Sequence, residues 1–82
     1  MKVNYKLVEI KPADKIGFIT GNRTVNRSIV NKLKESMTRW GILTAITVTK
    51  YGNRYFLVDG QHRYTAAKEL GMVIPAIVVP KE

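Results

Sequence analysis

The sequence contains no cysteine among its 82 residues. Disulfide bonds, thiolate zinc sites and thiol nucleophiles are therefore excluded. Histidine is also scarce, because His62 is the only one in the chain, and a histidine-rich metal site is not expected. The longest apolar run, IPAIVVP, is far shorter than the roughly 20 residues of a membrane-spanning helix, and the N-terminus lacks a signal-peptide pattern. These absences favour a cytoplasmic protein that does not enter a membrane.

Acidic residues are scarce as well. Six Asp and Glu accompany fourteen Lys and Arg, which gives a formal net charge of +8 at pH 7. A charge of this size on a short chain favours an anionic partner, namely nucleic acid, a nucleotide or phosphate. The alternative explanation is a solvated surface that only keeps the protein soluble, and charge alone does not identify the anion.

The length and the pattern of apolar residues predict one small domain over residues 1–82. Alternating or β-branched segments predict strands, and helical spacing predicts helices, in the order strands 3–10, helix 26–40, strands 42–50 and 54–59, helix 61–70 and strand 74–79. Residues 15–24 have two glycines and no clear period, so we expect an extended loop there. This order predicts an α/β (α+β) fold in which two helices pack on a small mixed sheet.

The first predicted helix has a one-sided apolar stripe. Asn26 or Ser28 can cap its N-terminus, and Gly41 is a typical residue to end it. The stripe consists of Ile29, Val30, Leu33, Met37 and Trp40. Spacing of this kind predicts that the stripe, including Trp40, is buried against the sheet. The alternative role for Trp40 is a platform on which a nucleic-acid base stacks.

Polar residues concentrate where a predicted strand meets the second helix. Asp59 and Gly60 end the strand, and Gln61, His62 and Arg63 begin the helix. A helix N-terminus favours an anion because it presents free N–H groups and the positive end of the helix dipole. Gly60 lacks the Cβ that blocks close approach of a ligand to the backbone, and Arg63 offers a planar fork that suits phosphate. The structural alternative is that Asp59 only caps the helix and His62 is an ordinary surface residue.

The sequence around this junction resembles the ParB/sulfiredoxin superfamily. Sulfiredoxins carry Gly-Cys-His-Arg-Tyr at this turn, and residues 60–64 are Gly-Gln-His-Arg-Tyr. ParB proteins carry a Gly-Glu-Arg-Arg-type turn there, followed by a helix that contains alanine. The predicted second helix of this chain likewise contains Ala66 and Ala67. Residues 22–48 look like the ParB N-terminal pattern of an arginine-containing loop, a helix ending in Ser-Met-x-x-x-Gly, and a strand. The resemblance covers nearly all of the chain from about Leu7.

The resemblance implies a site for the triphosphate of ATP or CTP, with magnesium, at the start of the second helix. The residues that match the family's phosphate cradle are Gly60, Gln61, His62 and Arg63, together with Arg23, which lies where the family loop has its arginine. Asp59 would orient Arg63 or contact a metal-bound water. No dedicated metal site follows from the residues. The implied function is a nucleotide- or phosphate-binding domain in DNA-associated biology, such as that of a mobile element.

Two departures from the family limit this inference. Gln61 stands where sulfiredoxins have cysteine, and an amide cannot replace a thiolate nucleophile, so reductase activity is not expected. Full partition proteins also have a second phosphate-contacting motif and a helix-turn-helix domain, so we do not expect this chain, if complete, to act as one.

Two other functions remain open, and with them whether the protein is an enzyme. The first is a ParB-like nuclease, nucleotide hydrolase or phosphotransferase, with His62 as general acid or base and Asp59 as the nearby carboxylate. The second is a non-catalytic DNA-binding or adaptor module whose basic surface contacts phosphates. The basic and aromatic residues 50–55 would suit single-stranded nucleic acid, or simply pack across a hairpin. Glu35 and Glu69 lie among lysines and are expected to be solvated partners along their own helices.

Overall fold

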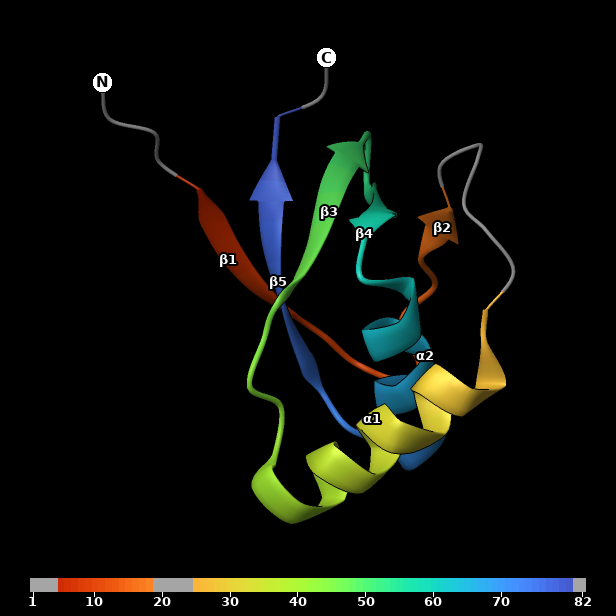
Figure 1. The fold of residues 1–82 in the computed structure, drawn as a ribbon. Coiled ribbons are helices and arrows are strands. Elements are labelled where there is room, and N and C mark those ends of the chain that lie inside the picture. The colour runs from red at the N-terminus through yellow and green to blue at the C-terminus, as the bar shows by residue number, and fades with distance from the viewer. Residues whose placement is uncertain (1–4, 19–24, 81–82) are drawn as a thin grey trace.

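The computed structural model describes residues 5–18 and 25–80. They form a five-stranded mixed sheet and two α-helices, which confirms the predicted fold class. The elements in chain order are β1 (Lys6–Ile10), β2 (Gly17–Phe18), α1 (Arg27–Trp40), β3 (Ile46–Tyr51), β4 (Arg54–Asp59), α2 (Gln61–Leu70) and β5 (Ile74–Val79). The two helices lie beside each other in the lower half of the view in Figure 1.

The strands are arranged in the order β1-β5-β3-β4-β2. β5 is antiparallel to β1 and parallel to β3, whereas β4 is antiparallel to β3 and parallel to β2. The β3–β4 pair is the hairpin that the sequence predicts. Because β4 has a neighbouring strand on each side and leads directly into α2, the polar junction after β4 is held by the sheet.

The short strand β2 lies in the segment 15–24, which the sequence predicts to be an extended loop. That prediction is wrong for Gly17–Phe18, which pairs in parallel with β4. Glycine fits at position 17 because the ring of Phe56, on the neighbouring strand, occupies the place where a Cβ would lie. A strand of two residues is too short to show the alternation that reveals longer strands.

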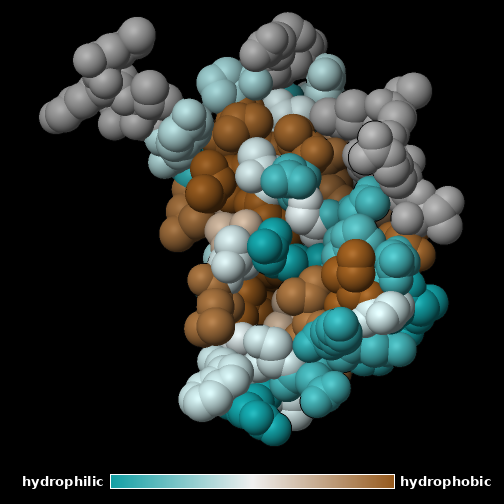
Figure 2. Space-filling view, viewed as in Figure 1, coloured by the Kyte–Doolittle hydropathy of each residue, from teal (hydrophilic) through white to brown (hydrophobic). Residues whose placement is uncertain are grey.

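The hydrophobic core combines alternate positions of the strands with one face of each helix. The buried apolar residues are Ile10, Ile16, Val30, Met37, Ile46, Val48, Leu57, Tyr64, Ala66, Ala67, Ile74 and Ala76. Ala66 and Ala67 have small side chains, which let α2 approach the sheet closely. In Figure 2 hydrophobic side chains gather over the strands, and hydrophilic side chains cover the region of α1. Neither helix in the described part of the chain is long and apolar enough to cross a membrane.

Trp40 is not part of this core, contrary to the prediction from helical spacing. Val30 and Met37 are buried and Leu33 packs against them, but Ile29 and Trp40 are 44% and 67% exposed. The exposed residues lie in the first and last turns of α1. The buried part of the stripe is therefore confined to the middle of α1.

Candidate anion-binding site at the start of α2

Gly60 connects β4 to α2 in a conformation that other residues avoid. It is the N-cap residue of α2, with φ 101° and ψ 29°, which is in the left-handed region where glycine is favoured. A Cβ on Gly60 would lie 2.7 Å from Cγ2 of Ile46 and 3.3 Å from its Cα. The space left by the missing Cβ therefore faces β3, not a ligand as expected. Glycine at this position lets the start of α2 pack directly against the sheet.

The first turn of α2 has no side-chain cap. The first helical hydrogen bond is donated by Tyr64 N–H to Gly60 O at 2.8 Å, and no side chain bonds to the cap. Asp59 is exposed and does not cap the helix, and no ion pair joins it to Arg63 in the structure as described. The N–H groups of the first three residues of α2 are therefore available to water or to an anion at the positive end of the helix dipole.

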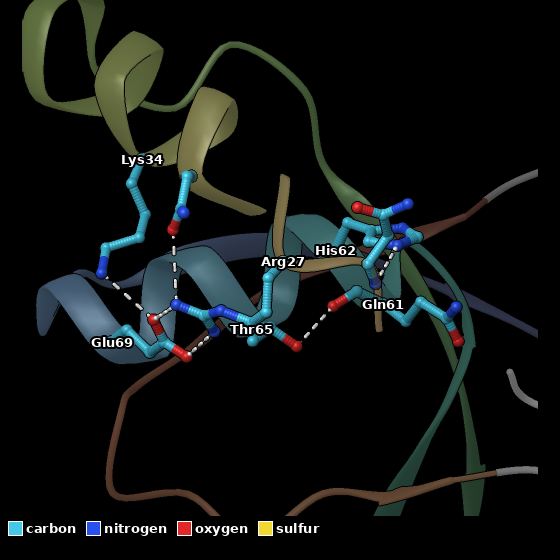
Figure 3. Close-up of polar contacts among 8 residues, drawn as sticks. Arg27, Lys34, Gln61, His62, Thr65 and Glu69 are labelled. Carbon is cyan, nitrogen blue, oxygen red and sulfur yellow. Dashed lines mark hydrogen bonds and ion pairs between the residues drawn. The ribbon is translucent and has the colours of Figure 1, made fainter. Parts of the chain in front are cut away.

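His62 ties the start of α2 to the start of α1. Its Nε2 accepts a hydrogen bond of 3.1 Å from the backbone N–H of Asn26 (Figure 3). Asn26, one of the two predicted N-cap candidates, is the N-cap residue of α1, and its Oδ1 accepts from the N–H groups of Ser28 and Ile29 at 2.9 Å and 3.3 Å. The N-terminal ends of both helices therefore meet at His62. Nε2 of His62 is therefore already engaged as a hydrogen-bond acceptor.

Arg63 extends towards the other end of α1. It is half-buried and lines a hollow of about 150 Å³ together with Leu33, Ser36, Met37, Gly41, Ile42, Leu43 and Thr44. No carboxylate pairs with Arg63 among the residues that the structure describes. Gly60 does not line this hollow. The volume of the hollow suits a phosphate group better than a whole nucleotide, because small-molecule pockets usually measure about 300–1,000 Å³.

The residues predicted to form one phosphate cradle are thus adjacent in the chain, but their side chains diverge. Figure 3 shows the side chains of Gln61 and His62 leaving the start of α2 in different directions, and Arg63 points to the hollow beside α1. Arg23, the fifth predicted residue, lies outside the described residues. What Gly60, Gln61, His62 and Arg63 share is the backbone of one helix start rather than a common side-chain pocket.

An ion cluster around Glu69 forms a second link between the helices (Figure 3). Arg27 places Nη1 2.6 Å from Oε2 and Nη2 3.1 Å from Oε1 of Glu69, and Lys34 Nζ is 3.1 Å from the same Oε1. Glu69 therefore joins α2 to α1 and is not the solvated partner within its own helix that we expected. The hydrogen bonds from Arg27 and Lys34 lower the pKa of Glu69 to about 2. Sequence patterns miss this cluster because its members are 42 and 35 residues apart.

The low pKa of Glu69 predicts a window of acid sensitivity. A carboxyl group whose pKa is lower in the folded state stabilises the fold above its unfolded pKa and loses this effect as the pH falls. The stability of the parent protein relative to Glu69→Gln should therefore decline from about pH 4.5 to about pH 2. Urea denaturation of both proteins across this range measures the difference. A difference that stays constant with pH would show that Glu69 is not held by these cations.

The chain belongs to the ParB N-terminal domain family, whose model matches residues 3–82. Its fold is similar to that of sulfiredoxin from Arabidopsis thaliana, with a TM-score of 0.77 and 26% identity over 93% of this chain and 86% of that one. No curated protein sequence matched the chain.

Two ParB structures show the same fold within longer chains. One is a C-terminally truncated chromosome-partitioning protein ParB from Caulobacter crescentus in complex with CTP-γ-S, with a TM-score of 0.75 and 22% identity over 94% of this chain. The other is a Pnob8-like ParB-N domain, with a TM-score of 0.71 and 16% identity over 100% of this chain. This chain spans 46% and 32% of the lengths of those two.

Proposed function

We propose that this domain binds the phosphate groups of a nucleotide at the N-terminal ends of its two helices. The observation that carries this proposal is the hydrogen bond of 3.1 Å between Asn26 N–H and His62 Nε2, which joins both helix N-termini beside the uncapped first turn of α2. The uncapped first turn of α2 offers N–H groups at the positive end of its helix dipole, and the start of α1 brings a second positive helix end beside it.

Charge and family membership support the same proposal. Arg63 belongs to the uncapped turn and has no carboxylate partner among the described residues, so its guanidinium is free to turn from the hollow beside α1 towards a phosphate at the start of α2. Arg27 is the first residue of α1, but its guanidinium already forms an ion pair with Glu69. The ParB structure from Caulobacter crescentus holds CTP-γ-S, and the net charge of +8 suits a domain that acts on or near DNA.

Magnesium fits this site only as a companion of the nucleotide. The described residues contain no group of three or more carboxylate, histidine or cysteine side chains able to hold a metal ion. Asp59 is exposed at the junction and would supply one carboxylate. Magnesium often binds one or two carboxylates and takes its other ligands from phosphates and water, so phosphate oxygens would dominate its coordination.

We propose binding rather than catalysis because of the position of His62. A general base must reach the proton that it removes, and Nε2 of His62 is engaged by Asn26. Using this nitrogen for catalysis would break the contact that holds the two helix ends together. The nuclease, hydrolase and phosphotransferase alternatives therefore gain no support from this geometry.

A thermal-shift measurement with ATP, CTP, GTP and ADP, each with and without magnesium, is the first test. A ligand that binds only the folded state at about 100 times its Kd stabilises it by about 2.7 kcal/mol, which raises the melting temperature clearly. We expect at least one triphosphate to do so. If none of the four nucleotides stabilises the protein, the proposed function is wrong.

The role of Arg63 is tested by calorimetry with the nucleotide that gives the largest shift. Arg63→Ala should weaken its binding by about 10- to 150-fold, because a charge-assisted hydrogen bond to phosphate is lost. Arg63→Lys should recover only part of this affinity, since an ammonium group lacks the bidentate fork. The matched control is Arg54→Ala, which removes an exposed arginine at the distant start of β4. Equal affinities for Arg63→Ala and Arg54→Ala would exclude Arg63 from the site.

A further inference from the structure

Trp40 is a large aromatic side chain that the fold leaves uncovered. It is the last residue of α1 and is 67% exposed, and Leu43 in the following loop is 76% exposed. Other aromatic rings carry a cation from their own chain: Lys50 lies 5.7 Å from the centre of Tyr55, and Arg54 lies 5.5 Å from the centre of Phe56. No ring or cation lies over Trp40 in the described part of the chain. Its indole faces are therefore accessible to a planar ligand.

A surface hollow beside Trp40 is lined by polar and basic residues. Trp40, Lys32, Glu35, Ser36 and Arg39 surround a hollow of about 270 Å³ on one side of α1. Neither Lys32 nor Arg39 forms an ion pair within the described residues. Two unpaired cations therefore flank an exposed indole, and one carboxylate accompanies them.

The hollow continues towards another cation. Ser36 also lines the neighbouring hollow of about 150 Å³, into which Arg63 extends. The surface from Trp40 past Ser36 to Arg63 therefore places one exposed aromatic ring beside several positively charged groups. A nucleic-acid strand offers the complementary pair, a flat base beside negatively charged phosphates.

We propose that this face of α1 binds single-stranded nucleic acid, with a base stacked on Trp40 and phosphates held by Lys32 and Arg39. Basic grooves that carry aromatic platforms are the usual way in which proteins bind single strands without sequence preference. The net charge of +8 would draw the strand to the domain. A duplex is a poorer ligand for this surface, because its base faces are covered by their neighbours in the stack.

Trp40 itself reports on the proposed contact, because it is the only tryptophan in the chain. A short oligothymidylate should quench its fluorescence. A strand of abasic sites of equal length, which has the phosphates but no bases, should quench it much less. A duplex of the same length should also quench it less than the single strand. If all three ligands bind with the same quenching, or the single strand binds without any, there is no stacking on Trp40.

Variants separate the aromatic contact from the charge. In fluorescence anisotropy with dye-labelled oligothymidylate, Trp40→Ala should lower the affinity by about 5- to 150-fold, which is the usual range for one stacked base. Tyr5→Ala, which removes another exposed aromatic ring, should leave the affinity unchanged. Lys32→Ala and Arg39→Ala should each reduce the dependence of affinity on salt by roughly one phosphate contact. Circular dichroism should show all four variants folded.

The main competing occupant of this surface is a second copy of the chain. Copies that pack through Trp40 would give a mass in light scattering that rises with protein concentration, and Trp40→Ala would remove this rise. That result, or an oligothymidylate affinity that is equal in Trp40→Ala and Tyr5→Ala, would overturn the proposal. A monomer whose Trp40 is quenched only by strands that carry bases would support it.

Discussion

The Leu57→Ala variant should lose about 2–5 kcal/mol of folding free energy, whereas Leu43→Ala should change it by no more than about 0.5 kcal/mol. Leu57 is fully buried in β4, between the neighbouring strands β3 and β2, and Leu43 is 76% exposed in the loop after α1. Both substitutions remove the same atoms. The difference between their free energies of unfolding therefore measures how much the burial of Leu57 stabilises the fold.

Urea denaturation of the two leucine variants and the parent protein measures this difference. A single core of this size supplies only about 3–5 kcal/mol, so Leu57→Ala should be partly unfolded even without urea. Equal midpoints for Leu57→Ala and Leu43→Ala would mean that the assigned core is wrong. The result also guides binding experiments, because a core variant that fails to bind a nucleotide has lost its fold and says nothing about the site.

The sequence predicts the order of the main elements correctly because each has a clear signal of its own. The second helix is found at residues 61–70 as predicted, since Gly60 and Gly71 mark its ends and an apolar strand precedes it. The hairpin strands are equally clear from their β-branched and aromatic residues. The family resemblance, confirmed by the match over residues 3–82, rests on the same segments.

The sequence pattern could not predict features that depend on contacts between two distant segments. Helical spacing places Trp40 on the apolar stripe, but it does not reveal that the last turn of α1 stays exposed in the folded domain. The contacts of Asn26 with His62 and of Arg27 with Glu69 join residues 36 and 42 positions apart. No periodicity connects such pairs. The sequence therefore points to the start of α2 as the candidate site, but it does not reveal that the start of α1 lies against it.

The Gly60→Ala variant should be destabilised by about 2–5 kcal/mol, because two independent costs combine. The left-handed backbone conformation costs a residue with a Cβ about 1–2 kcal/mol. Here the new Cβ would also lie 2.7 Å from Cγ2 of Ile46, and relieving such a contact in a packed core costs about 1–3 kcal/mol. The domain would lose most of its stability through one added methyl group.

Gly71→Ala is the matched control because it adds the same methyl group at the other end of α2. Gly71 also has a left-handed backbone, with φ 70°, but a Cβ there has nothing within 4 Å. Gly71→Ala should therefore lower the folding free energy only by the cost of the left-handed backbone, about 1–2 kcal/mol. Denaturation curves of both variants measure the excess at Gly60. If Gly60→Ala were no less stable than Gly71→Ala, the close packing of this junction on Ile46 would be disproved.

The Gly60 result separates the fold from the proposed site. Part of the Gly-Gln-His-Arg sequence is explained without a ligand, since Gly60 packs on Ile46 and His62 binds Asn26. Gly60→Ala should therefore lower nucleotide affinity only in proportion to the unfolded fraction. Arg63→Ala should lower the affinity while the melting temperature stays close to that of the parent protein. If both variants lose affinity only as they lose stability, the whole junction is structural and the nucleotide proposal fails.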